Sequence, residues 1–343
     1  MVPDVSLHVR SGVRPEAVPV ELDDFLDGLD GPTVFAVDGH DPSRVRVVSG
    51  TLHGDEPSGV RAIHRMLREG RRPVTDVLMF VGAVDAARQP PRLSHRFLPG
   101  RRDLNRCFRP PWDGLDGTIA QAALAALTAR TPELAVDLHN NTGRNPSYAI
   151  GSILSGPHLA LTALFTHRFI HSEIVLGTMT EAMNQHCPSI TVECGQARDP
   201  EADETAWLGL VRLFELPRLD PVVVTAETLM IFSSPERVEL TANTTLAFGA
   251  TPVAGVDLTL DPEIDRHNFQ TLSPGTRIGT LRPGAAWPIV VRGACGVDRS
   301  RELFELDDNG DLVTREAVVP IMMTTSPAAA ISDCLFYAVH RQQ

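Results

Sequence analysis

The stretch "VVSGTLHGDEPSGVRAIHRML", residues 47–67, joins an apolar run to a helix-like segment and decides the fold. His53, Asp55 and Glu56 follow directly where the apolar run stops. Pro57 suits the first position of a helix, and the apolar residues after it recur at steps of three and four. A short apolar run that leads into an amphipathic helix is typical of a strand in a parallel sheet.

Strand-like and helix-like segments alternate from this stretch to about Leu216. The strand-like runs, rich in Val, Ile and Leu, are residues 44–50, 76–84, 133–139, 172–177 and 189–195. The segments with helical spacing are residues 57–69, 117–130, 157–168 and 201–214. This alternation predicts an α/β fold with a mainly parallel sheet flanked by helices.

The pattern of predicted secondary structure changes near Leu216–Pro221. Short β-type runs such as "RVELTANTTLAFGA" and "LFELDDNGDLVTR" follow, broken by Pro, Gly, Asn and Asp. We therefore expect two domains: an α/β domain over residues 1–218 and a smaller β-rich domain over residues 219–343.

The composition is that of an ordinary globular protein, with 43% hydrophobic and 22% charged residues among 343. No apolar run has the length of a membrane span, and the N-terminus lacks a basic-then-apolar signal pattern, so we expect a cytoplasmic protein. The net charge of −12 argues against nucleic acid or an anionic membrane as a partner.

Two residue types limit the chemistry. All 31 basic residues are arginines, so no lysine serves as a Schiff base, general base or phosphate ligand. The five cysteines are scattered and never form C-x-x-C, which predicts a reducing compartment and neither a disulfide framework nor a zinc–thiolate cluster.

Polar side chains follow three of the predicted strands at their carboxyl ends. Strand 44–50 leads to His53 and Glu56, strand 133–139 ends in His139, and strand 189–195 carries Glu193. Ligands of open parallel sheets bind outside this edge, so we expect these side chains to face one crevice.

Two imidazoles and a carboxylate with an open fourth position form a common catalytic zinc set. His53 and Glu56 reach one ion if the backbone turns at Gly54. Taken alone, His53 and Glu56 are better explained as a loop histidine and a helix-start acid, and His139 as a hydrogen-bonded strand end. Because all three are expected at one edge of the sheet, we favour the interpretation that they are metal ligands. Asp55 is expected to face away from the site.

Two further acids have two interpretations each. Asp137, two residues before His139, either holds an imidazole N–H of that ligand or caps a nearby helix. Glu193 lies within an apolar strand, where a lone carboxylate needs a partner or a task. It is either paired with a structural arginine or is the general base beside the metal, which we prefer.

The motifs "TLHGDEPSG", "GRRDLNRCF", "VDLHNNTG" and "ITVECG" resemble, in order and approximate interval, those of the succinylglutamate desuccinylase/aspartoacylase family, relatives of the zinc carboxypeptidases. The resemblance covers about residues 44–200. It implies a zinc-carboxypeptidase-like mixed sheet with a smaller C-terminal β domain. It also implies hydrolysis of the amide bond of an N-acyl amino acid, a bond other than an ordinary peptide bond.

The resemblance also assigns roles by motif. It makes His53, Glu56 and His139 the ligands of one Zn²⁺ per chain and Glu193 the general base and acid. It makes Asn105 and Arg106 substrate binders, and arginine forks match carboxylates in a bidentate fashion. For the arginine that stabilises the oxyanion, the chain offers Arg96, Arg101 and Arg102, of which we prefer Arg96 because its "R-aromatic-Leu" resembles the family pattern.

Two departures from the family pattern concern the substrate. Aspartoacylase-like enzymes have a further arginine about ten residues before the catalytic glutamate, and "GTMTEAMNQHCPSITVE" has none. This weakens N-acetylaspartate as the substrate. No substrate-binding tyrosine can be assigned, although Tyr148 follows His139 by nine residues and lies within reach.

Two other functions share part of this pattern. A zinc carboxypeptidase acting on short or modified peptides has the same metal and base residues. A non-catalytic metal-binding module has no need of a base such as Glu193. The sequence leaves the acyl group, the amino acid and the formation of a homo-oligomer open.

Overall fold

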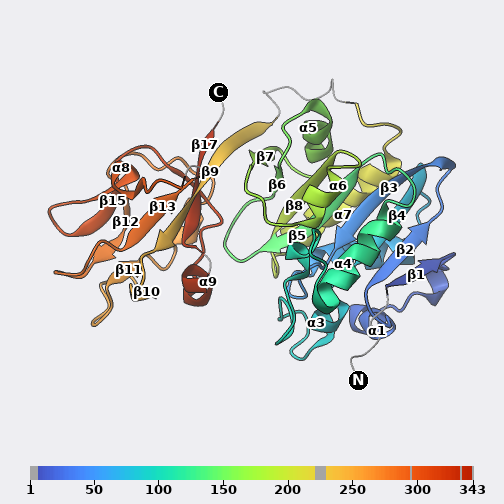
Figure 1. The fold of residues 1–343 in the computed structure, drawn as a ribbon, viewed down its shortest axis with the longest axis horizontal. Helices are drawn as coiled ribbons and strands as arrows, with labels where there is room; N and C mark the ends of the chain where they lie inside the picture. Colours follow the sequence, from blue (N-terminus) through green and yellow to red (C-terminus); the bar gives the residue numbers. More distant parts are fainter. Residues whose placement is uncertain (1–6, 221–228, 294–295, 333, 342–343) are drawn as a thin grey trace. The chain divides into compact units, whose positions relative to one another are not determined.

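A computed structural model describes residues 7–220, 229–293, 296–332 and 334–341 (Figure 1). By their internal contacts these residues form two units. Unit 1 consists of residues 7–140, 147–170, 174–220 and 229–230, and unit 2 of residues 141–146, 171–173 and the described residues from 231 onwards. The domain boundary expected between residues 218 and 219 stays a prediction, and Pro221 lies outside the described residues.

Unit 1 is built on a mixed sheet. Its strand order is β1 (His8–Ser11), β2 (Thr33–Val37), β4 (Thr75–Val81), β3 (Asp41–Gly50), β5 (Ala135–Asn141), β8 (Ser189–Gln196), β6 (Tyr148–Gly151) and β7 (Arg168–His171). Strand β3 runs parallel to β4 and to β5, whereas β2 is antiparallel to β4 and β6 is antiparallel to β8. Ser49 near the end of β3 pairs in register with Asp137 of β5, so the carboxyl ends of these strands lie side by side.

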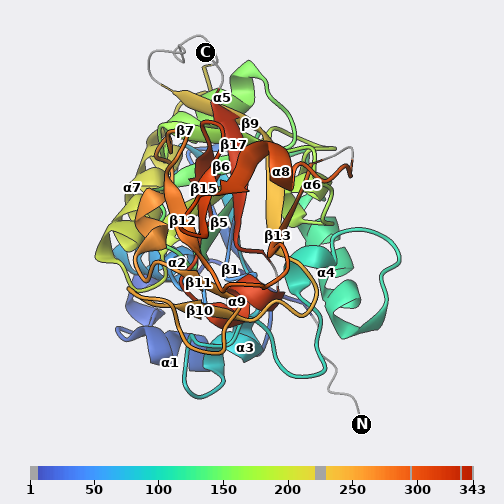
Figure 2. The same cartoon turned by 90° about the vertical axis from the view of Figure 1, so that its left-hand side faces the viewer.

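Helices cover both faces of this sheet. They are α1 (Leu22–Asp27), α2 (Ser58–Glu69), α3 (Val84–Arg88), α4 (Gly114–Leu127), α5 (Gly156–Ala163), α6 (Met179–Met183) and α7 (Pro200–Glu215). Helix α2 packs against α7, and α4 packs against α6. Figure 2 shows α7 and α4 on opposite sides of the strands. The core beneath α4 includes Val47, Phe80, Ile119, Ala123 and Met183.

Most of the predicted elements are confirmed, but the strand expected over residues 172–177 is wrong. Strand β7 ends at His171, and residues 172–178 form no helix or strand. The backbone N–H groups of Leu176 and Gly177 each donate to the Glu181 carboxylate at 2.8 Å. The run is apolar but not buried, since Val175 is 67% exposed. Hydrophobicity alone therefore predicted a strand where none forms.

Unit 2 is β-rich, as the sequence predicts. In one group of strands, β9 (Met230–Leu240) pairs antiparallel with both β13 (Ile289–Arg292) and β17 (Phe336–Arg341), and β17 pairs antiparallel with β16 (Val319–Ile321). A five-stranded sheet has the order β10 (Leu246–Phe248), β11 (Leu258–Leu260), β12 (Arg277–Leu281), β15 (Asp311–Thr314) and β14 (Phe304–Leu306). The helices α8 (Ser300–Leu303) and α9 (Pro327–Ser332) are short. Leu258, Ile278, Phe304 and Phe336 belong to its core.

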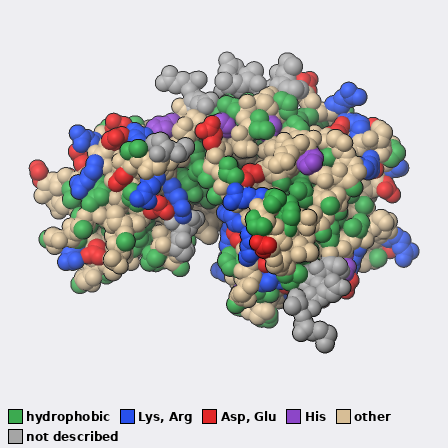
Figure 3. All heavy atoms as spheres, viewed as in Figure 1, with side chains coloured by type: hydrophobic (Ala, Val, Ile, Leu, Met, Phe, Trp, Pro, Cys, Tyr) green, Lys and Arg blue, Asp and Glu red, His purple; other side chains and the backbone are tan. Residues whose placement is uncertain are grey.

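The surface carries both signs of charge. On the face drawn in Figure 3, acidic and basic side chains occur side by side on each unit. Many of the arginines form ion pairs with acids, as Arg92 does with Asp27. Within the described ranges, none of the helices has the length and hydropathy needed to span a membrane.

Helix α2 begins with its backbone pressed against β3. A Cβ built on Gly59 would lie 2.8 Å from the Cα of Gly50 and 3.2 Å from the Cβ of Leu138. Such distances leave no room for a side chain, so glycine is required where strand and helix meet. This contact determines where α2 begins, immediately after the loop that carries His53 and Glu56.

We expect Gly59→Ala to lower the free energy of unfolding by about 1–3 kcal/mol, because the added methyl group overpacks the contact with β3. The higher helix propensity of alanine, about 1 kcal/mol, does not offset this. Denaturant unfolding followed by circular dichroism measures the change.

The matched control is Gly28→Ala at the end of α1, where φ is −75° and an added Cβ meets nothing closer than 3.4 Å. That variant should be neutral or more stable by about 0.5 kcal/mol. Equal destabilisation of both variants would contradict the proposed packing constraint.

Candidate functional site

The loop between β3 and α2 carries the first two polar side chains of the site. Thr51 has a positive φ of 57°, which is rare for a β-branched residue and turns the chain sharply after β3. Gly54 donates its N–H to the Arg96 carbonyl at 3.0 Å, and a Cβ there would lie 2.5 Å from the Ala87 nitrogen. The loop is therefore fixed against its surroundings, and it directs His53 and Glu56 inward.

The carboxylate of Glu56 lies between two imidazole rings. Its Oε1 is 2.8 Å from His53 Nδ1, and its Oε2 is 2.6 Å from His139 Nδ1. One ligand atom from each residue lies within 4.8 Å of the others. All three residues are buried, with exposed fractions of 3%, 7% and 3% for His53, Glu56 and His139. The structure thus brings His139 of β5 to two side chains of one loop, and His139 lies 83 residues after Glu56 in the sequence.

The outer nitrogen of each imidazole is held by an aspartate. His53 Nε2 is 2.9 Å from Asp103 Oδ1, and His139 Nε2 is 2.7 Å from Asp137 Oδ2. An acceptor at Nε2 keeps the imidazole hydrogen on that nitrogen, so Nδ1 has the free lone pair and faces the centre of the cluster. The contact expected between Asp137 and its neighbouring histidine is present, whereas the sequence interpretation missed Asp103.

Charges determine the protonation of this cluster. Burial alone would raise the pKa of Glu56, but the two histidines lower it well below its ordinary value. Burial alone would lower the pKa of His139, but Asp137 and Glu56 raise it well above its ordinary value. Burial likewise opposes ionisation of Asp103, yet His53 and Arg96 lower the pKa of this carboxyl. The cluster therefore favours an ionised Glu56.

A metal ion fits this donor set. Two imidazole nitrogens and one carboxylate converge, and three protein ligands leave a position open, as in catalytic zinc sites. The aspartates behind both histidines are the outer partners that such ligands require. Asp55, expected to face away, makes no hydrogen bond with either histidine among the residues described, and it is half-buried.

Glu193 of β8 is close enough to interact electrostatically with His139, Glu56, His53 and Arg96. It is 8% exposed, and its Oε2 has no hydrogen-bond partner in the described part of the chain. Burial raises the pKa of Glu193 to about 7. No arginine in the described part of the chain forms a hydrogen-bonded ion pair with this carboxylate, which speaks against the structural alternative.

Of the three candidate arginines, Arg96 is the one that lies at the cluster. Its Nη1 donates to Glu56 Oε1 at 3.3 Å, and its Nη2 donates to Asp103 Oδ2 at 2.9 Å. Arg101 pairs with Asp116 at 2.6 Å, and Arg102 donates to the Asp113 carbonyl at 3.1 Å.

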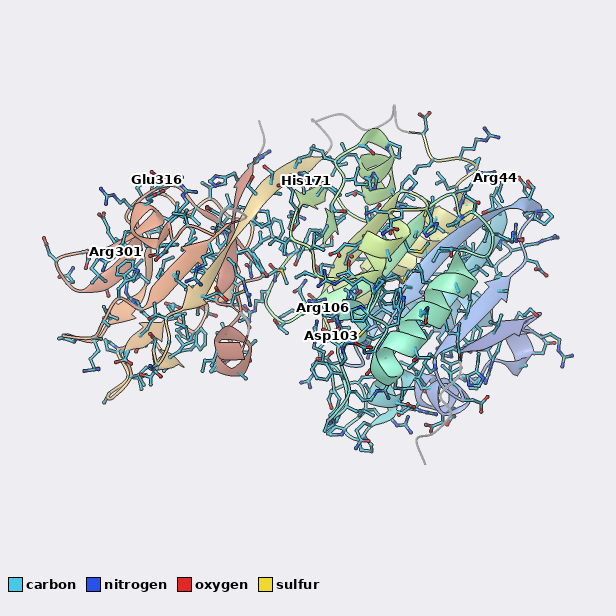
Figure 4. All side chains as sticks on the ribbon, in the orientation of Figure 1. Arg44, Asp103, Arg106, His171, Arg301 and Glu316 are labelled. Carbon is cyan, nitrogen blue, oxygen red and sulfur yellow. The ribbon has the colours of Figure 1, made fainter. Side chains whose placement is uncertain are left out.

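Asn105 and Arg106 belong to the short 3-10 helix η2 (Leu104–Arg106) beside the cluster. The amide nitrogen of Asn105 is 3.1 Å from His139 Nε2, and its amide oxygen accepts the Met179 N–H at 2.9 Å. Arg106 is half-buried and donates to the Asn105 carbonyl at 2.8 Å. Figure 4 labels Arg106 near Asp103. Contact of either residue with substrate stays a prediction.

Three other residues of interest lie near the site. Tyr148 is fully buried and pairs with Glu193 across β6 and β8, so both side chains lie on one face of the sheet. Cys107 and Cys194 are 1% and 2% exposed, and burial raises the pKa of both thiols. These cysteines therefore pack as small apolar residues.

The residues that the sequence interpretation missed are hydrogen-bonding partners rather than ligands. Asp103 stands two residues before Asn105 in "RDLNR", and an acid in so basic a loop was the available signal. Asn140 directly follows His139, and Ser58 begins α2. Neither had a recognisable spacing, because their partners lie in distant segments.

Comparison with known proteins identifies the family. A family model described as the succinylglutamate desuccinylase/aspartoacylase catalytic domain matches residues 43–208. No curated protein sequence matches the chain.

Solved structures share the fold along most of the chain. The succinylglutamate desuccinylase/aspartoacylase from Rhodobacter sphaeroides is 16% identical, with a TM-score of 0.62 and coverage of 91% of this chain and 88% of that chain. Succinylglutamate desuccinylase from Vibrio parahaemolyticus is 15% identical, with a TM-score of 0.57 and coverage of 90% and 86%. Murine aminoacylase 3 is 18% identical, with a TM-score of 0.52 and coverage of 89% and 97%. Over residues 43–208 the chain therefore carries the catalytic domain of the succinylglutamate desuccinylase/aspartoacylase family.

Proposed function

We propose that this protein is a zinc-dependent deacylase that hydrolyses the amide bond of an N-acyl amino acid. The observation that carries the proposal is the buried cluster of His53, Glu56 and His139 beside Glu193. Family membership supports a hydrolytic deacylase. One Zn²⁺ per chain is the cofactor that the donor set fits, and a small N-acyl amino acid is the partner.

His53 Nδ1, His139 Nδ1 and the Glu56 carboxylate would hold the ion. When bound there, zinc acts as a Lewis acid and lowers the pKa of a water molecule towards about 7. Glu193 takes a proton from the attacking water and later gives it to the leaving nitrogen. A carboxyl group whose pKa is raised to about 7 is suited to both transfers near neutral pH.

Arginines supply the remaining roles. In this proposal Arg96, whose guanidinium lies against Glu56 and Asp103, stabilises the developing oxyanion. Asn105 and Arg106 bind the carboxylate of the substrate.

The direct test of the function is amine release from a panel of N-acyl amino acids, with and without a chelator. We expect release that the chelator abolishes and added zinc restores. Hydrolysis of C-terminally varied peptides in place of the acyl amino acids would make the protein a carboxypeptidase. Zinc binding without turnover on either panel would make it a binding module.

Glu193→Gln should lower kcat by at least about a hundredfold, because the amide cannot accept and return the proton. Elemental analysis should still find zinc in this variant. Glu204→Gln, on the exposed face of α7, is the control and should have normal kcat. Normal activity of the Glu193 variant would contradict its role as the base.

Arg96→Ala should lower kcat by about 10²–10³-fold at saturating zinc, since it removes a donor for the developing oxyanion. The control is Arg102→Ala, an exposed arginine of the same loop. Steady-state kinetics on a substrate found in the panel measures both. Equal kcat values for the two variants would exclude Arg96 from this role.

Asp103→Asn should weaken zinc binding by about 10–100-fold, because His53 loses its charged partner at Nε2. Competition with a chromophoric chelator measures the affinity. Asp116→Asn is the matched control, since Asp116 is a buried acid that pairs with Arg101 of the same loop. The assignment fails if both variants bind zinc equally well.

A further inference from the structure

The buried amide of Asn140 connects three segments of the site. Asn140 is 4% exposed and directly follows His139. Its Oδ1 accepts the backbone N–H of Ser58 at 3.0 Å. Its Nδ2 donates to Ser58 Oγ at 2.9 Å and to the Gly195 carbonyl at 3.0 Å. Both hydrogens of the amide and its oxygen are therefore in use.

The two residues that bond to this amide have the same offset in sequence from the two glutamates of the site. Ser58 lies two residues after Glu56, and Gly195 lies two residues after Glu193. One side chain thus links the loop of Glu56, the strand end of His139 and the strand end of Glu193.

The backbone of Asn140 also touches the cluster directly. Its N–H donates to Glu56 Oε2 at 3.2 Å, the same oxygen that faces His139 Nδ1. Arg96 holds the other oxygen of this carboxylate. The rotation of the Glu56 carboxylate is therefore set from both sides by groups that are not themselves proposed ligands.

A chain of hydrogen bonds fixes which way the Asn140 amide faces. Asp203 of α7 accepts from Arg61 at 2.9 Å and from Ser58 Oγ at 2.6 Å. An ionised carboxylate only accepts hydrogen bonds, so the Ser58 hydroxyl donates its hydrogen to Asp203. The Ser58 oxygen is then left to accept from Asn140 Nδ2, and the amide oxygen must face the Ser58 N–H.

We propose that Asn140 is a positioning residue that holds Glu56, His139 and Glu193 in register and thereby raises the metal affinity of the site. This inference rests on the proposed function, because it presumes that the cluster binds a metal. Asparagine fits the task because alanine makes none of the three side-chain hydrogen bonds and aspartate lacks both side-chain N–H donors.

The test compares Asn140→Ala with Asn268→Ala in the full-length protein. Asn268 of unit 2 is 5% exposed and also makes three hydrogen bonds: it accepts from the Met323 N–H and donates to the carbonyls of Arg144 and Met323. Among the described residues, the side chain of Asn268 makes no hydrogen bond with the cluster. It therefore matches Asn140 in burial and bonding but not in place.

Zinc affinity is measured by chelator competition at a temperature at which circular dichroism shows both variants folded. Wild-type affinity is measured first, and absence of zinc binding there would end the proposed function and this inference together. If the wild type binds zinc, Asn140→Ala should lose about 10–100-fold in affinity and Asn268→Ala should not. Equal affinities would overturn the positioning role and leave the proposed function standing.

A second readout separates positioning from general loosening. Cobalt(II) bound in place of zinc has a visible absorption band that depends on its ligand geometry. We expect Asn140→Ala to change this band and Asn268→Ala to leave it unaltered. If Asn140→Ala does not fold, Ser58→Ala replaces it, since it removes one bond of the amide; a wild-type spectrum and affinity in that variant would overturn the inference.

Discussion

The carboxylate of Glu56, buried between the imidazoles of His53 and His139, is the interaction on which the site depends. A buried carboxylate without compensation costs several kcal/mol, so its neighbours must supply positive charge or hydrogen bonds. The two histidines do so, and each then needs an acceptor at its outer nitrogen, which Asp103 and Asp137 provide. Charges of alternating sign continue outward from the cluster, since Arg96 in turn balances the negative charge of Asp103.

The architecture of unit 1 makes this cluster attainable. Parallel pairing of β3 with β5 places the segments of Glu56 and His139 at one edge, and β8 beside β5 adds Glu193. The contact of Gly59 with β3 brings α2 close enough for Ser58 to reach Asn140. Precision in the site therefore depends on backbone packing and on a few buried amides as much as on the ligands.

The sequence predicts the strands and helices of unit 1 well where burial and hydrophobicity agree. It fails at residues 172–177, where an apolar run is exposed and a carboxylate binds the backbone instead. Ligand types are predictable because their chemistry is distinctive and strand ends converge. Asp103 and Asn140 are not, because their partners lie 50 and 82 residues away and ordinary acids and amides carry no signature.

The most direct test is a crystal structure of the protein loaded with zinc, with anomalous diffraction measured at the zinc edge. We expect one ion per chain, about 2.0–2.2 Å from Nδ1 of His53, from Nδ1 of His139 and from an oxygen of Glu56. The Nε2 atoms should remain with Asp103 and Asp137. An ion bound through the Nε2 atoms, or no anomalous peak among these three residues, would contradict the account.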